Sequence, residues 1–246
     1  MHKNNMAPKI SVILCHNSSW PAFHIFNPND WSGKSKPIIE LCAANFGLLI
    51  YTSKLINDIF REAQALCAPS FVNLKSKWRI SKWEIPRCTY LADVPNLHLS
   101  IHSFLSTVKT YLDVLVQLTN TEGIVSVEVH GFHKRGKTIG GELLNILKNN
   151  ATKSKQNTAM LLYDLIIDHK RIWIDNSVNS RDLLIHPKSL VKMMFILVIS
   201  EKDKELNLDG ILKPALNGEE FDIYAKKTLL KIEEFTNLFL RYIKNA

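Results

Sequence analysis

LHLSIHSFLSTVKTYLDVLVQL, residues 97–118, decides the class of fold. Its apolar side chains recur every three or four residues, which is the period of one face of an α-helix. They are Ile101, Phe104, Leu105, Val108, Leu112, Leu115 and Val116. A stripe this wide is stable only when it is buried against other elements. The stretch therefore predicts one long helix of a helical bundle.

Comparable patterns lie on both sides of this stretch and extend the bundle. Apolar residues at helical spacing predict helices over residues 37–66, 141–147, roughly 156–173, and 221–243. Pro37 suits the first turn of a helix, because an amide hydrogen there would have no partner within the helix. We therefore predict a mainly α fold built as a bundle of long antiparallel helices.

The other segments have weaker patterns. Residues 1–36 mix Pro, Asn, Ser and Trp without a steady period, which predicts an irregular N-terminal arm before a single domain over residues 37–246. Residues 121–135 contain β-forming side chains, and residues 190–216 combine an apolar run with turn residues. Small β elements, including a hairpin, are therefore expected as insertions in the helical domain.

The charge balance bears on the class of partner. The chain of 246 residues has 31 Lys and Arg against 23 Asp and Glu, a formal net charge of +8. An excess of this sign favours contact with a polyanion such as nucleic acid. The alternative is that many of these lysines form the solvated faces of helices.

Cysteine spacing and hydropathy indicate the compartment. Cys15, Cys42, Cys67 and Cys88 are dispersed and form no C-x-x-C pair, so neither a zinc site nor a redox dithiol is expected, and no cofactor. The N-terminal residues lack the apolar core of a signal peptide. The longest apolar runs are shorter than the ~20 residues of a membrane-spanning helix. These features predict a cytoplasmic protein with no membrane association.

A basic, glycine-rich segment follows residue 130. Lys134, Arg135 and Lys137 lie between glycines, and cations on such a tip can follow a phosphate backbone. These three residues are therefore candidate RNA-binding residues. The alternative is an ordinary solvated loop.

The candidate chemistry lies in Arg181-Asp-Leu-Leu-Ile-His186, between the third long helical stretch and the next element of the bundle. An Arg, a polar residue, three apolar residues and a His resemble the R-x4-6-H signature of the HEPN superfamily. The helical segment FLSTVKTYLDVLVQL, residues 104–118, and the closing helix agree with a HEPN-like four-helix bundle.

The resemblance implies a specific activity. Many HEPN proteins are metal-independent endoribonucleases, often toxins or antiviral effectors, in which two protomers of a homodimer bring their Arg and His pairs into one cleft. By this analogy Arg181 would bind the scissile phosphate, and His186 would act as general acid or base. The RNA 2′-hydroxyl would be the nucleophile. An antitoxin or another regulatory protein is a further expected partner.

Two carboxylates and two alternatives complete the prediction. Asp182, where the family more often has Asn, could orient Arg181 or His186, and Asp113 could hold Arg181 across the bundle. A HEPN-like bundle can also serve as a non-catalytic nucleic-acid-binding or protein-interaction scaffold. In a purely structural interpretation, Arg181 contacts the carbonyl groups at a helix C-terminus and His186 marks a turn before Pro187.

Overall fold

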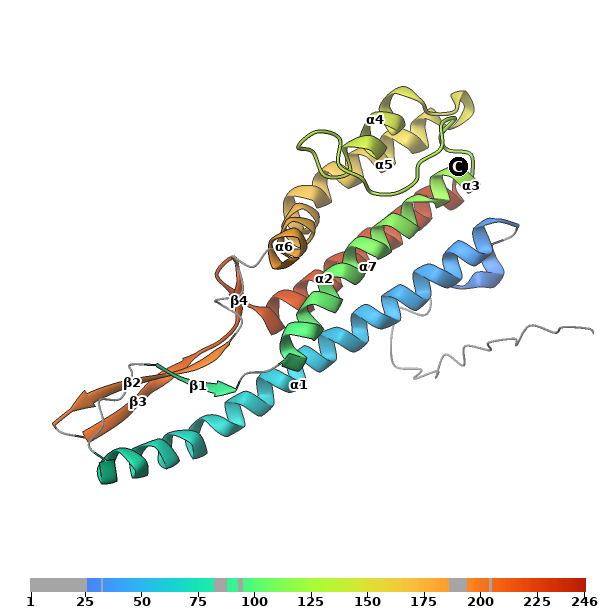
Figure 1. Cartoon of the computed structure of the whole chain (residues 1–246). Coiled ribbons are helices and arrows are strands. Elements are labelled where there is room, and N and C mark those ends of the chain that lie inside the picture. Colours follow the sequence, from blue (N-terminus) through green and yellow to red (C-terminus); the bar gives the residue numbers. More distant parts are fainter. Residues whose placement is uncertain (1–25, 32, 82–87, 93–94, 186–193, 204) are drawn as a thin grey trace, which may run out of the picture.

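The computed structural model describes residues 26–31, 33–81, 88–92, 95–185, 194–203 and 205–246, which form an elongated, mainly helical molecule (Figure 1). The predicted mainly α class is confirmed. The helices are η2 (Pro28–Asp30), α1 (Ser35–Ser81), α2 (Pro95–Val116), α3 (Leu118–Thr121), α4 (Gly141–Asn149), η3 (Lys153–Lys155), α5 (Gln156–His169), η4 (Lys170–Ile174), α6 (Asp175–Ile185) and α7 (Phe221–Lys244). The strands are β1 (Cys88–Ala92), β2 (Phe195–Lys202), β3 (Glu205–Leu212), β4 (Ala215–Leu216) and β5 (Glu219–Glu220).

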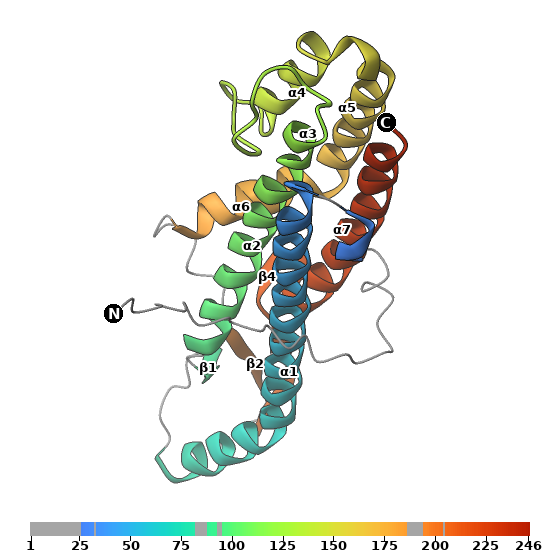
Figure 2. The same cartoon turned by 90° about the vertical axis from the view of Figure 1, so that its right-hand side faces the viewer.

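The helices form three layers. α1 lies on one side and packs on α2 and α7, while α4, α5 and α6 lie on the other side (Figures 1 and 2). α5 packs on α7 and on α4, and α6 packs on α2. The middle helices α2 and α7 are therefore covered on both sides, whereas α1 keeps an outer face.

The middle layer contains the core that the sequence pattern predicts. Phe104 and Tyr111 of α2 have no exposed surface, and Phe104 meets Phe221 of α7 edge-on with 6.3 Å between ring centroids. The hydroxyl of Tyr111 shares a short hydrogen bond with that of Thr236 on α7, so this buried polar group is paired. Apolar burial and one buried polar contact thus join α2 to α7.

α1 extends well beyond the predicted helix end near residue 66. It continues through Pro69 to Ser81, although a proline inside a helix removes one hydrogen bond. The extension buries one further stripe, formed by Cys67, Phe71, Leu74 and Trp78. These residues again recur at steps of four and three, and they need a partner outside the bundle. That partner stabilises the helix past the proline.

The partner is a three-stranded antiparallel sheet in the order β1-β2-β3. Leu197 and Ile199 of β2 and Leu206 of β3 form a second, small core against the end of α1. Phe195 joins this arm to the bundle, where its ring lies 5.0 Å from that of Phe60. The arm, defined as residues 61–81 with β1, β2 and β3, projects away from the bundle (Figure 1).

The two regions expected to contain β elements differ. Within residues 190–216, β2 and β3 form the hairpin of the arm, although residues 190–193 and 204 lie outside the described residues. Residues 121–135 hold only isolated bridges, between Val125 and Ala151 and between Arg135 and Thr138. The rest of this segment forms an irregular loop, in which Ile124, Val125 and Val129 lie in the bundle core while Val127 is exposed.

The predicted N-terminal arm is described only from residue 26. Phe26 and Trp31 are buried, and the ring of Phe26 lies 5.7 Å from that of Phe46 on α1. Residues 1–25 lie outside the described residues.

α1 is also apolar. By length and composition alone, its segment Ser35–Trp78 could cross a membrane, and 39% of the most apolar window is buried inside the protein. Core helices of soluble proteins meet the same criterion.

Candidate functional site

Arg181 lies in the last turns of α6, which belongs to the same layer as α4 and α5. Its side chain is half-buried, and α6 packs on α2. Asp182 belongs to the same helix, but its side chain is not among those described, and His186 lies outside the described residues. The motif therefore begins inside a helix, whereas the sequence placed it between a helix and the next element.

The chain approaches this helix through a π-helical segment. η4 (Lys170–Ile174) separates α5 from α6, and such π segments are rare and frequent at functional sites. The wider turn lets the buried Lys170 reach Asp175, whose carboxylate lies 2.6 Å from the Lys170 Nζ. The same ammonium donates to the carbonyl of Ile139 at 2.7 Å. Lys170 thus ties η4 to the loop before α4.

A buried histidine lies just before η4. His169 accepts a hydrogen bond at Nδ1 from the Trp173 indole Nε1, at 2.9 Å, and its ring lies 5.1 Å from that of Phe235. Burial lowers the pKa of His169 below its ordinary value of 6.5; Glu234 raises it and Lys231 lowers it further. An imidazole that accepts a hydrogen bond at Nδ1 carries its single proton at Nε2 and is therefore neutral. The site therefore holds the neutral form.

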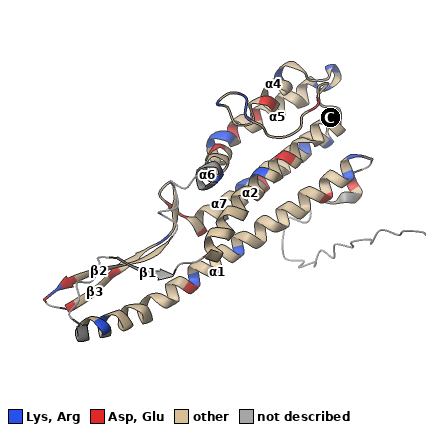
Figure 3. Ribbon diagram, in the orientation of Figure 1, with Lys and Arg blue, Asp and Glu red and all other residues tan. Residues whose placement is uncertain are grey.

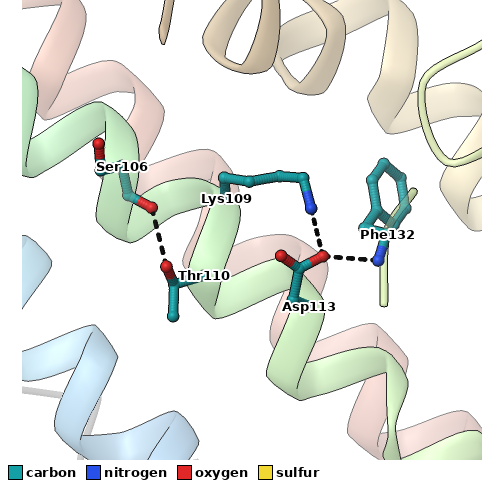
Figure 4. A network of polar contacts seen from close by, with 5 residues as sticks. All are labelled: Ser106, Lys109, Thr110, Asp113 and Phe132. Atoms are coloured by element: carbon teal, nitrogen blue, oxygen red, sulfur yellow. Dashed lines mark hydrogen bonds and ion pairs between the residues drawn. The ribbon is translucent and has the colours of Figure 1, made fainter. Parts of the chain in front are cut away.

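Asp113 of α2 anchors the loop that carries the basic segment (Figure 4). Its carboxylate accepts the backbone N–H of Phe132 at 2.6 Å and pairs closely with Lys109 one turn earlier on α2. Among ion pairs between described residues, Asp113 pairs with Lys109 and not with Arg181. The described contacts of this carboxylate are thus local ones, with Lys109 and with the loop N–H.

Two further contacts hold the same loop. The Asn120 side chain donates to the carbonyl of Val129 at 2.6 Å and accepts its N–H at 2.9 Å, so it acts like a neighbouring strand. The Phe132 ring is fully buried beneath Gly140, which has φ +64°. A Cβ at Gly140 would lie 2.4 Å from that ring, so only glycine fits.

The basic segment forms a tight turn at the outer end of this loop. The N–H of Arg135 donates to the carbonyl of Thr138 at 3.0 Å, and the reverse bond is 3.2 Å long. Gly136, at φ +61°, makes the turn. Lys134, Arg135 and Lys137 are exposed on it, and Lys and Arg mark the loop beside α4 in Figure 3. We call this the basic turn.

The predicted residues thus fall into two groups. Asp113 belongs with Lys134, Arg135 and Lys137, because it anchors the base of the loop that ends in the basic turn. Arg181 lies on α6. The loop and α6 both belong to the layer that covers α2 (Figure 1). The sequence prediction missed Asn120 and Lys170. Both are single polar residues that bind backbone groups of the loop, and no sequence spacing signals such contacts.

Within the described parts of the chain, no group of three His, Cys, Asp or Glu side chains could hold a metal ion. No protein-family model, curated protein or solved structure matches this chain.

Proposed function

We propose that this chain is a metal-independent endoribonuclease of the HEPN type. The observation that supports this most is the sequence spacing of Arg181 and His186, together with the position of Arg181 in the last turns of a helix packed on α2 within a basic helical bundle. The half-buried position of Arg181 suits a guanidinium that must meet a phosphate with reduced competition from water. We place the protein in the cytoplasm, as a toxin or defence effector whose partner proteins include an antitoxin or regulator.

The proposed reaction needs only groups of the chain and of RNA. His186 takes the proton of a ribose 2′-hydroxyl, whose oxygen attacks the adjacent phosphorus while the bond to the 5′-oxygen breaks. A protonated His186 of the second protomer supplies the proton to the leaving 5′-oxygen. Arg181 stabilises the charge on the phosphoryl oxygens. The products are a 2′,3′-cyclic phosphate and a 5′-hydroxyl, and Asp182 would orient one member of this pair.

The experiment incubates the purified protein with mixed RNA in EDTA. We expect 2′,3′-cyclic phosphate ends, and their loss in Arg181→Ala and in His186→Ala. Arg171→Ala is the matched control, because Arg171 is an exposed cation of the preceding η4. The proposal fails if no variant cleaves RNA, or if cleavage survives both substitutions.

The alternative function is a non-catalytic scaffold that binds nucleic acid. The observation that favours it is the basic turn, which is held in one shape by backbone hydrogen bonds independently of Arg181. Reversing Lys134, Arg135 and Lys137 to Glu should weaken RNA binding and reduce the salt slope by about 2, since each contact to single-stranded RNA contributes about 0.7. The control reverses three other exposed lysines, Lys148, Lys153 and Lys226.

These variants separate the two functions. Binding that depends on the basic turn, without cleavage, supports the scaffold. Unchanged affinity and unchanged salt slope in the reversed variant would remove the turn from either function.

A further inference from the structure

The outer face of α1 carries an apolar stripe that no other described element covers. Its exposed members are Leu41, Ala44, Leu48 and Tyr51, and the half-buried Leu55, which also packs against the core, continues their alternate spacing of three and four residues. Leu41 is 50% exposed, Leu48 42% and Tyr51 62%. This is the spacing of a two-helix coiled-coil seam, and it lies opposite the stripe by which α1 packs on α2 and α7. A helix that is already buried on one side thus presents a second seam to solvent.

The charges beside this seam are arranged symmetrically about Gly47. Glu40 lies seven residues before Gly47 and Lys54 seven residues after it. Lys36 lies eleven residues before Gly47 and Asp58 eleven residues after it. All four side chains are exposed. Each of these two pairs joins an acidic and a basic residue. Two antiparallel copies of the helix would therefore place opposite charges next to each other.

Gly47, at the centre of this charge pattern, would allow a second helix to approach α1 closely. A Cβ at Gly47 would meet nothing within 4 Å, so packing within the protomer does not require glycine there. Glycine inside a helix costs about 1 kcal/mol relative to alanine. The absence of a side chain at Gly47 is explained if a second helix crosses α1 at this point.

The end of the seam leads into a groove. Leu55, Asp58, Ile59 and Glu62 of α1 and Asn96, Leu99 and Ser100 of α2 line a groove of about 380 Å³. Leu99 is 67% exposed at its edge. In an antiparallel pairing centred on Gly47, the first turn of the other α1 lies over this groove. Lys36 of that copy then meets Asp58 and Glu62 at the rim, where Asp58 also pairs with Arg61 at 2.7 Å.

We propose that the outer face of α1 is the interface of a homodimer, in which two copies of α1 pack antiparallel about a two-fold axis at Gly47. Across a two-fold axis the same surface of each copy contacts that of the other, which agrees with the self-complementary charges. The seam from Leu41 to Leu55 spans about 21 Å at the rise of an α-helix, and the two grooves extend it at both ends. The partner is therefore a second copy of this chain.

This interface does not depend on the proposed nuclease function. α1 and α6 lie on opposite sides of the middle layer (Figures 1 and 2), so an α1 dimer does not bring two Arg181 side chains together. Failure of the RNA assay and failure of the dimer assay are therefore separate results.

The first test measures the mass of the full chain in solution by sedimentation at micromolar concentration. We expect a dimer, and a dissociation constant at least about a hundredfold higher for Leu48→Asp, because a charge at the centre of a packed seam is costly. The control Leu230→Asp makes the same change at a leucine of α7 that is 64% exposed. Circular dichroism shows whether each variant keeps its helices.

The second test determines the direction of pairing. Glu40→Lys or Lys54→Glu alone should weaken the dimer about tenfold, because each turns two attractive pairs into repulsive ones, and the double exchange should restore it. The double variant Glu40→Cys with Lys54→Cys should form a disulfide-linked dimer under mild oxidation. Each single cysteine variant should form no more cross-linked dimer than the wild-type chain does.

Several results would overturn the proposal. These are a monomeric wild-type chain, a dimer that Leu48→Asp leaves intact, or cross-linking through Glu40→Cys alone, which indicates parallel helices. A monomer that binds lipid vesicles through this face, or whose residues 1–25 protect it from hydrogen exchange, would identify a different occupant and refute the homodimer.

Discussion

Removing the Asp113 carboxylate should loosen the loop of the basic turn while leaving the bundle folded. In Asp113→Ala, the N–H of Phe132 loses its 2.6 Å acceptor, and Lys109 loses its ion-pair partner. Phe132 is fully buried, so its N–H would remain without a partner. A hydrogen bond to a charged group contributes about 1.5–3 kcal/mol, and an unpaired buried donor costs a similar amount. The local opening free energy should fall by that much.

Amide hydrogen exchange measures this loss directly. At 1.4 kcal/mol per factor of ten, the protection of the Phe132 amide should fall about ten- to hundredfold, while amides in the middle of α2 and α7 keep most of theirs. Asp113→Asn retains an acceptor oxygen and should lose less protection. Unchanged protection in Asp113→Ala would refute the assignment of Asp113 as the loop anchor. Loss of RNA cleavage with unchanged protection would instead support the sequence-based role beside Arg181.

Three further predictions concern other parts of the structure. Burial holds the pKa of His169 in the folded chain below its unfolded value of 6.5, so the neutral side chain contributes fully to stability above that pH, and stability should fall as the pH drops below it. Thermal melts of His169→Gln should show a weaker dependence on pH. Gly140→Ala should lower the melting temperature clearly more than Gly136→Ala, because both glycines have positive φ but only the first would place a Cβ against Phe132; equal shifts would contradict this. Leu206→Asp should abolish exchange protection of β2 and β3 with little change in the melting of the bundle, since Leu206 is 3% exposed in the small core of the arm; a bundle that melts together with the arm would refute their independence.

The helices that carry one continuous apolar stripe could be predicted from sequence, whereas α6 was not predicted, because the helical pattern was expected to end near residue 173. α2 was predicted at residues 97–118 and spans Pro95–Val116, and the closing helix was predicted at 221–243 and spans Phe221–Lys244. α1 differed because two separate stripes follow each other on one helix, one for the bundle and one for the arm. Pro69 favours an end of the helix at this point, but the packing of α1 against the sheet of the arm stabilises the helix beyond it.

The candidate site was predictable to a smaller extent. The exposure of Lys134, Arg135 and Lys137 follows from their glycine-rich surroundings. The contacts of Asp113 and Lys170 with the loop do not follow from the sequence, because both bind its backbone groups and the loop has no periodic pattern. The π-helical turn at η4 is equally hidden, since its residues suit an ordinary α-helix.

The two proposed surfaces constrain each other. A composite nuclease cleft needs two α6 helices in contact, whereas the α1 seam lies on the far side of α2 and α7. If both proposals hold, the chain has two different two-fold interfaces, and copies joined alternately through them would extend beyond a dimer unless an antitoxin or regulator covers one. The Leu48→Asp variant separates the cases. Cleavage that persists when the α1 seam is broken assigns the cleft to a second contact through α6, and cleavage lost with the seam shows that activity requires the larger assembly.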